Sequence, residues 1–314
     1  MEHGRLDNLQ RRYAPLAFCY AVVRKYLDDG GAREAALITY YGFLSLFPVL
    51  LLGAAVVSRV FLDSPELRAD VVAAIVPPSL RADMADSVAV LSRSRTALIA
   101  GMIGLAYSGT GVVFSAYLTL NHLAAVPFRD RRGAVSRILR VLTGLAAILT
   151  GAIAAGVLTV AITSTPYGLS RALGLAASCL VSGAVLTALA RLLLDRPAPL
   201  RSLWPAALTG AVAVTTTLNV GAAVLPRLVR GAGLVYGGFA TVAGVFALLY
   251  FLSNALVLAA EVAAVRHGRL WPRSFGAGRP TTADRRALRL LTREQDRLRL
   301  PPGDSRGGGF TPAG

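Results

Sequence analysis

The first long apolar segment constrains this chain more strongly than any other feature of its sequence. It reads AALITYYGFLSLFPVLLLGAAVVSRV, and no charged side chain occurs between Leu37 and Val57. About 20 mostly apolar residues are enough for a helix to cross a bilayer. Tyr41, Ser45 and Pro48 follow the spacing i, i+4, i+7, so they share one face of that helix. A helix surrounded by lipid needs no polar face, so we expect this face to turn toward protein or a water-filled cavity.

Five further apolar segments follow along the chain, and together they predict an all-α, polytopic bundle of six transmembrane helices. Hydrophobic residues make up 54% of the 314 residues, which is more than one soluble domain of this length would contain. Amphipathic helices are predicted in two further places, the N-terminal region and the first outer linker at 63–96. The predicted spans are 37–62, 96–120, 141–163, 172–194, 203–225 and 236–265.

The six-span membrane domain, 37–265, is flanked by two basic segments. Residues 1–36 form an N-terminal segment in which 16–27 has the composition of an amphipathic helix. That helix either lies on the membrane surface or packs against the bundle. Residues 266–314 form an Arg-rich tail that is expected to be largely disordered, with 284–300 as a candidate helix.

Positive charge lies at the ends of the apolar segments and predicts the topology. The net charge is +16, and Lys25 is the only lysine. Arginines are frequent near both termini, in the turn 121–140 and in the link 195–202, which the positive-inside rule places in the cytoplasm. Both termini are therefore predicted to be cytoplasmic. The same placement favours membrane lipids, with anionic head groups at the cytoplasmic face, over nucleic acid as partners.

A search for chemistry finds no catalytic or metal-binding motif. His3, His122 and His267 have no second ligand at a spacing of three or four residues. The sequence has no Walker loop and no GxSxG elbow. We therefore expect neither an enzyme nor a bound metal or cofactor, although a site assembled from residues distant in the sequence stays open. The sequence does not decide the oligomeric state.

Polar residues inside the predicted spans are the candidates for a substrate pathway. For Ser45 the alternative is a hydrogen bond to a backbone carbonyl, and for Asn254 it is a bond to another helix. The candidates are Tyr40, Tyr41, Ser45 and Pro48 on the first span, Tyr107 and Asn121 on the second, and Asn254 and Glu261 on the sixth.

The two ends of the sixth span carry different signals. Ionisable groups within a span usually face the protein interior and often mark a path, which makes Glu261 a candidate for the pathway. Because Glu261 lies near the cytoplasmic end, the alternative is that it pairs with Arg266 or reaches water. Gly233 and Gly237 form a GxxxG pattern, which we interpret as a turn followed by close helix packing rather than as a dimer face.

Several of these segments resemble a known family. The stretch ALITYYGFLSLFPVLL resembles the first-span signature of the YihY/BrkB family of bacterial inner-membrane proteins. The resemblance covers about residues 20–270, and LSLFP is its most specific part. The chain departs from the family pattern after Tyr236-Gly237 and in its long Arg-rich tail. Further matching segments are Leu120-Asn121 before a basic turn, Val235-Tyr236-Gly237-Gly238 at the start of the sixth span and Ala259-Ala260-Glu261 near its end.

The resemblance implies a six-span fold, an inner-membrane location and a link to envelope integrity or virulence. Members have been labelled ribonuclease BN, a label widely regarded as misassigned. Links of some members to lipid or lipopolysaccharide export imply a transporter or flippase for a lipid-like or amphipathic substrate, which is the leading hypothesis. Without an ATP-binding motif, movement would be passive or ion-coupled. The alternatives are a non-transporting scaffold that binds envelope partners and a membrane ribonuclease.

Overall fold

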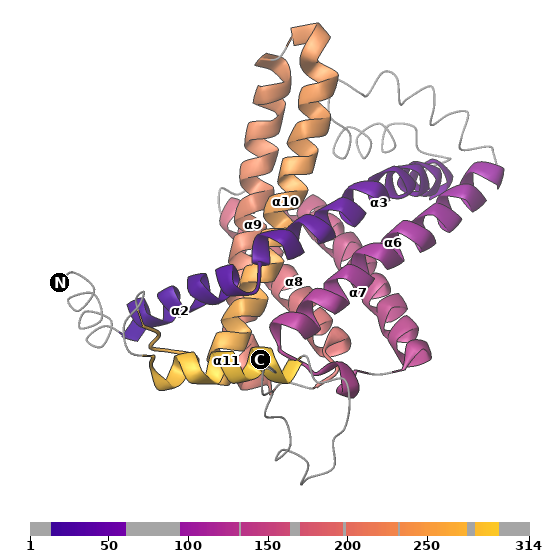
Figure 1. Ribbon diagram of the computed structural model, residues 1–314. Coiled ribbons are helices and arrows are strands. Elements are labelled where there is room, and N and C mark those ends of the chain that lie inside the picture. Colours follow the sequence, from indigo (N-terminus) through magenta and orange to yellow (C-terminus); the bar gives the residue numbers. More distant parts are fainter. Residues whose placement is uncertain are drawn as a thin grey trace, which may run out of the picture.

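The computed structural model describes residues 14–60, 95–131, 133–163, 170–196, 199–231, 233–274 and 280–294 (Figure 1). Within these ranges the chain consists of helices and short connections, and no strand occurs. The all-α fold class predicted from the sequence is confirmed. The helices predicted in the outer linker 63–96 fall almost wholly outside the described residues.

Six long helices occupy the positions of the six predicted spans. Five of them, α6 to α10, are long and apolar enough to cross a membrane, as judged from the described residues. The bundle is therefore of the polytopic membrane type, and the count of six spans stays a prediction. The helices are α3 (Gly31–Val60), α6 (Arg95–Leu123), α7 (Ala134–Thr163), α8 (Ser170–Leu193), α9 (Leu200–Gly231) and α10 (Gly233–Gly268).

The bundle is arranged around α10, which contacts α9, α3, α6 and the N-terminal helix α2 (Ala14–Asp28). The neighbouring pairs α7 with α8, α8 with α9, and α3 with α6 complete the packing. Figure 1 shows α9 and α10 as a tall antiparallel pair, crossed obliquely by α3. At 1.5 Å per residue, the 36 residues of α10 span roughly 54 Å, longer than the ~30 Å hydrocarbon core of a bilayer. At least one end of α10 therefore extends beyond the hydrocarbon region.

One end of the bundle, which we call the basal end, gathers segments that are far apart in the sequence. It comprises α2, the C-terminal ends of α6, α8 and α10, the N-terminal ends of α7 and α9, and α11 (Thr282–Glu294) (Figure 1). Backbone carbonyls there accept side-chain hydrogen bonds across helices, as from Lys25 Nζ to the Leu123 oxygen at 3.0 Å. The Arg-rich segments that the positive-inside rule assigns to one side thus lie at one end.

The two amphipathic helices of the basal end pack against α10. The predicted helix at 16–27 is found as α2, and its small apolar face is buried while Leu16, Val23 and Leu27 remain exposed. Of the two alternatives for this helix, packing against the bundle is observed for one face. The predicted tail helix is found as α11. The shared apolar contact consists of Ala21, Val22, Val265, Leu270 and Ala287.

The start of α11 is determined by a capping box. The Asp284 backbone N–H donates to Thr281 Oγ1 at 3.1 Å, and the Thr281 backbone N–H donates to Asp284 Oδ2 at 2.8 Å. Arg273 then bridges two elements, because its guanidinium lies 3.1 Å from Asp284 Oδ1 and 2.9 Å from Asp28 Oδ2. Burial raises the pKa of Asp284, but hydrogen bonds from Thr281 and Ser274 outweigh it and hold that pKa well below its usual range.

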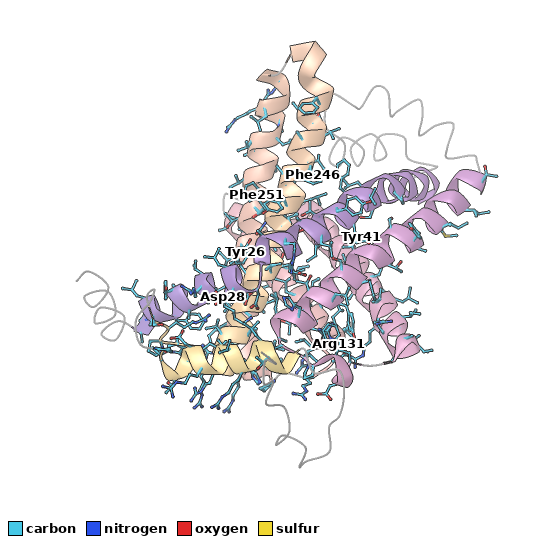
Figure 2. The ribbon with its side chains drawn as sticks, in the orientation of Figure 1. Tyr26, Asp28, Tyr41, Arg131, Phe246 and Phe251 are labelled. Carbon is cyan, nitrogen blue, oxygen red and sulfur yellow. The ribbon has the colours of Figure 1, made fainter. Side chains whose placement is uncertain are left out.

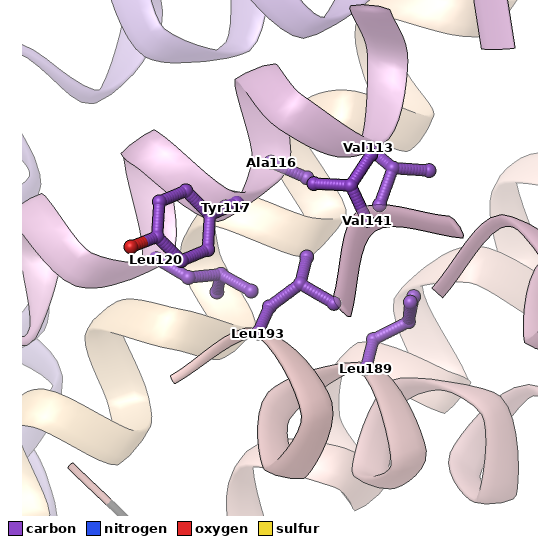
Figure 3. Packing of buried hydrophobic residues seen from close by; sticks show 7 residues of the cluster. All are labelled: Val113, Ala116, Tyr117, Leu120, Val141, Leu189 and Leu193. Carbon is purple, nitrogen blue, oxygen red and sulfur yellow. The ribbon is translucent and has the colours of Figure 1, made fainter. Parts of the chain in front are cut away.

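The largest apolar cluster lies where α6, α7 and α8 meet (Figure 3). A Cβ on Gly144 of α7 would lie 2.9 Å from Val113 Cγ1, so a glycine permits this close approach. Outside the clusters many large apolar side chains are exposed, including Leu180 and Phe239 at 75% each, as expected for a surface that contacts lipid. The residues of the cluster are Val113, Ala116, Tyr117, Leu120, Val141, Leu189 and Leu193.

Candidate functional site

A tight corner between α2 and α3 positions the charged residues of the basal end. Gly30 adopts a φ of 68°, in the left-handed region that glycine reaches without strain. A Cβ on Gly31 would lie 2.3 Å from the Tyr26 ring, so this position also requires glycine. The Gly-Gly pair therefore ends α2 abruptly. It leaves Lys25 and Asp29 facing the C-terminal part of α10.

Three charged side chains form a buried cluster at this corner, which we call the ionic cluster: Lys25, Asp29 and Glu261. Lys25 Nζ lies 3.0 Å from Glu261 Oε2 and also donates a hydrogen bond to Asp29. The Glu261 side chain is 0% exposed and that of Lys25 is 9% exposed. Glu261 thus pairs with Lys25, and the pairing with Arg266 that the sequence suggested is not observed. Arg266 instead lies over the Trp204 ring, with its guanidinium carbon 5.7 Å from the ring centroid.

The environment of Lys25 favours its charged form. Burial lowers the pKa of Lys25, but the carboxylates of Glu261 and Asp29 raise it further, so the net change is upward. The neighbouring Tyr26 donates a hydrogen bond of 2.5 Å to Asn254 Oδ1 and lies beside α10 (Figure 2). Burial raises the pKa of Tyr26, which keeps the phenol protonated as the donor. Helix α2 is therefore attached to α10 by both an ion pair and a hydrogen bond.

Beside the ionic cluster lies a partly enclosed cavity of about 320 Å³, which we call the basal cavity. Its walls come from α6, α8, α9 and α10, and Lys25 of α2 and Leu290 of α11 contribute at its end. Small side chains leave this space open, because alanines stand where larger residues would fill it. The alanines include Ala190, Ala206, Ala207, Ala259, Ala260 and Ala263.

Polar groups are few in the basal cavity, and most of them are basic. They are Lys25, Thr187, Arg196 and His267. Arg196 pairs with Asp130, and Thr187 Oγ1 donates to the Gly183 carbonyl at 2.7 Å. The volume lies at the lower end of the range of ~300–1,000 Å³ seen for small-molecule sites. A mostly apolar lining that includes basic side chains suits the chain and head group of a small anionic amphiphile.

At the basal end, Asn121 connects α6 to the C-terminal end of α8. This side chain is fully buried, and its Nδ2 donates to the carbonyls of Tyr117 and Leu193 at 2.9 and 2.8 Å. Its Oδ1 accepts from the backbone N–H of Asp195 at 3.0 Å. Arg140 donates to two more carbonyls of the same chain segment, those of Leu192 and Leu194. Side chains of α6 and α7 thus donate hydrogen bonds to carbonyls at the end of α8, where no backbone N–H of the helix is available to them.

The candidates of the first span lie along the contact between α3 and α6. Tyr41 lies between these helices (Figure 2), where a Cβ on Gly111 would come within 2.6 Å of its ring. Pro48 packs in the same way against Gly104, whose Cβ would lie 3.1 Å from Pro48 Cγ. Ser45 Oγ donates to the Gly42 carbonyl at 2.7 Å, as the alternative reading predicted. Tyr40 is 55% exposed, with its ring edge against Tyr41.

The remaining candidates divide into exposed and buried groups. Tyr107 is 84% exposed on the outer face of α6. Asn121, Asn254 and Glu261 are all at the interface between helices, and Asn254 links α10 to α2 as the alternative reading predicted. Gly233 and Gly237 lie in the first turns of α10. The contacts of these two glycines are not among those that the structure describes, so their proposed role in helix packing stays a prediction.

None of the eight pathway candidates is among the described residues that line the basal cavity. Two of them are close to it, since Glu261 pairs with Lys25 and Asn121 follows the lining residue Leu120. A role for the eight in a substrate pathway stays a prediction. The residues that sequence reasoning missed are Lys25 and the alanines of α9 and α10. The single lysine of the chain, just before Asp-Asp-Gly-Gly, was the available signal for the first.

Among the residues that the structure describes, no group of three or more His, Cys, Asp or Glu side chains is placed to hold a metal ion. Comparison with protein families matches residues 22–280 to the family described as Virulence factor BrkB. No curated protein and no solved structure shows significant similarity to the chain.

Proposed function

Since the chain belongs to the Virulence factor BrkB family and has several membrane-spanning helices, it is a multi-pass membrane protein, and we propose that it moves a lipid-like or amphipathic substrate. The proposal assigns it a transport role, as a transporter or flippase-like protein, and no catalysis. The observation that carries the proposal is the basal cavity, whose lining is mostly apolar and includes Lys25. Such a site accepts an acyl chain and an anionic head group together.

The proposed setting is the bacterial inner membrane, with the basal end and both termini in the cytoplasm. The Arg-rich segments gathered at the basal end support this orientation, because positive charge is retained on the cytoplasmic side. The exposed arginines of α11, among them Arg285, Arg286 and Arg289, support anionic head groups as partners there. A contribution to envelope integrity follows from lipid transport. Nucleic acid is not a proposed partner.

The main alternative is a scaffold that binds envelope partners without transporting anything. A scaffold has no need of internal space, and a bundle packed as tightly as other protein interiors would favour it. The basal cavity weighs against this alternative, because alanines from three helices keep it open. The membrane ribonuclease alternative gains no support from the described residues, which lack a metal-binding cluster.

The test is transbilayer movement of a fluorescent single-chain anionic phospholipid in proteoliposomes, measured with an impermeant quencher. Ala190→Leu adds three carbon atoms to the cavity wall on α8 and should slow the movement roughly tenfold, as expected for a small apolar pocket losing its volume. Ala176→Leu makes the same change at an exposed position of α8 and should have no effect. Wild-type protein that moves lipid no faster than empty liposomes contradicts the proposal.

The pathway candidates are tested in the same assay. Tyr41→Phe and Glu261→Gln change the polar group and preserve the size of each side chain. Rates equal to wild type in both variants would remove these two residues from the mechanism and leave the basal cavity as the proposed route.

A further inference from the structure

The ionic cluster contains more negative than positive charge. Two carboxylates, Asp29 and Glu261, share the ammonium of Lys25, and all three side chains are at least nine-tenths buried. Lys25, 3.0 Å away, is the one cation that pairs with Glu261 among the described residues. A buried carboxylate that depends on one cation becomes very unfavourable as an anion when that cation is taken away.

The other titratable groups around Glu261 do not replace Lys25. Tyr26 of α2 and Tyr250 of α10 are phenols. His122 of α6 acts on Glu261 electrostatically, while its Nε2 lies 3.4 Å from the Asp29 carbonyl. The guanidinium of Arg273, which lines the same small cavity as Lys25, lies between Asp28 and Asp284 and is paired with both.

Lys25 belongs to both the ionic cluster and the basal cavity. Its side chain lines the cavity, and its ammonium pairs with Glu261. An anionic head group in the cavity would therefore compete with Glu261 for the same cation. From this shared position we propose that Lys25 and Glu261 form a proton-coupled site, in which binding of an anionic head group to Lys25 is accompanied by uptake of one proton on the Glu261 carboxylate.

The charges balance in this step. The head group brings one negative charge, and Glu261 changes from carboxylate to carboxylic acid by taking a proton from water. Lys25 remains an ammonium ion throughout, and it exchanges one anionic partner for another. The net charge of the buried site is then the same before and after binding, so no additional buried charge is created in the low-dielectric interior.

A small polar cavity lies beside Lys25 and Asp29 of the ionic cluster. A second cavity of about 20 Å³, large enough for one water molecule, is lined by polar groups that include Lys25, Asp29, His122 and Arg273. These groups can each hydrogen-bond a water, and α11 covers the far side through Ala287 and Leu291. The small cavity thus places a water site next to Lys25 and Asp29, between the ionic cluster and α11. The inference rests on the proposed function, because it requires an anionic amphiphile in the basal cavity.

The experiment measures proton uptake when palmitoyl-lysophosphatidylglycerol binds the full-length protein in nanodiscs. Titration calorimetry in two buffers with different ionisation enthalpies gives the number of protons taken up per ligand. On the alkaline side of neutrality the expected value for wild type is close to one. Palmitoyl-lysophosphatidylcholine has the same chain without a net charge, and its binding should take up no proton. A measurement that needs no variant is the pH dependence of affinity, which should weaken roughly tenfold per pH unit on the alkaline side of neutrality.

Glu261→Gln keeps the size of the side chain and cannot take up a proton. It should bind the anionic lysolipid with the proton uptake and the pH dependence both abolished. Glu34→Gln is the matched control, because Glu34 is another poorly exposed carboxylate that accepts a hydrogen bond from Thr119 at 2.7 Å and does not line the cavity. Its proton uptake should equal that of wild type.

Three outcomes would overturn the inference. The first is binding of the anionic lysolipid without proton uptake, and the second is a requirement for sodium in place of the proton. Either outcome would leave the proposed function in place. Uptake that persists in Glu261→Gln and disappears in His122→Gln would assign the proton to His122. Failure of wild type to bind either lysolipid would instead count against the proposed function itself.

Discussion

The basal end and the rest of the bundle are held together by different interactions. At the basal end, buried polar groups connect segments that are distant in the sequence, as in the contacts of Lys25 with Glu261 and of Asn121 with Leu193. Along the middle and far parts, hydroxyls bond carbonyls of their own helices, as Thr150 does, and neighbouring helices approach at glycines such as Gly151. The exposed faces there carry large apolar side chains.

The difference follows from the solvent on each side. In hydrocarbon, apolar side chains contribute no hydrophobic driving force to helix association, so close packing at small residues has to supply the contacts. At the basal end, helix termini leave carbonyls without backbone donors, and buried side chains such as Asn121 and Arg140 satisfy them. The same polar groups give this end an internal cation next to an apolar cavity. The proposed function therefore lies at the end where the polar groups are concentrated.

The largest expected effect is the loss of the cation of the ionic cluster. Lys25→Met leaves Asp29 and Glu261 buried without a positive partner, and the free energy of unfolding should fall by about 3–5 kcal/mol. Arg24→Met, one residue earlier, removes a surface ion pair with Asp28 and should cost less than about 1 kcal/mol. Unfolding in mixed micelles with increasing denaturing detergent measures both. Equal effects in the two variants would show that burial does not distinguish these pairs.

The next effect concerns Asn121. Asn121→Ala leaves the Leu193 carbonyl and the Asp195 N–H buried without a partner, so the free energy of unfolding should fall by about 2–4 kcal/mol. Asn219→Ala is the matched control in α9, because Asn219 bonds only the Thr215 carbonyl of its own helix, and the loss should stay below about 1 kcal/mol. A control variant as unstable as Asn121→Ala would remove the contrast between the two regions.

Close packing in the middle of the bundle is tested at two glycines. Gly111→Ala forces the Tyr41 ring away from α6 and should destabilise the protein by about 1–3 kcal/mol. Gly42→Ala, on the neighbouring helix, meets no atom within 4 Å, and should be neutral or stabilising by up to about 1 kcal/mol because alanine favours helix. Thermal unfolding of the purified protein separates the two. Destabilisation by Gly42→Ala would mean that its surface packs against another chain.

The smallest effect is local to α11. Asp284→Asn weakens the capping box and the contact with Arg273. The free energy of local opening of α11 should therefore fall by about 0.5–2 kcal/mol, which is measured as faster hydrogen exchange at its amides. Because the pKa of Asp284 is lowered in the folded chain, its contribution is complete above the ordinary carboxyl pKa of about 4 and is lost as pH falls toward the lowered value. The protection factors of the α11 amides, which are corrected for the intrinsic pH dependence of exchange, should therefore not change between about pH 7 and pH 5 for wild type. Early opening in that window would contradict the assignment.

Much of the architecture follows from local sequence. Each predicted span coincides with a long helix, and the helices at 16–27 and in the tail are found as α2 and α11, because apolar run length and periodicity are properties of neighbouring residues. The candidate site was harder to predict from the sequence. The polar residues of α3 were correctly placed on a face toward protein at Tyr41 and Pro48, yet that face meets α6 and not the cavity. Tyr107, assigned to the same pathway, is on the outer surface.

The sequence by itself determined an all-helical membrane bundle, the positions of its helices and the gathering of positive charge at their ends, since these depend on hydrophobicity and charge within short windows. Only the tertiary structure decided that Glu261 meets Lys25 instead of Arg266, and that alanines of α8, α9 and α10 enclose a cavity beside that pair. Such contacts depend on how helices cross. A small change in crossing geometry exchanges one partner for another without changing the local pattern of either helix.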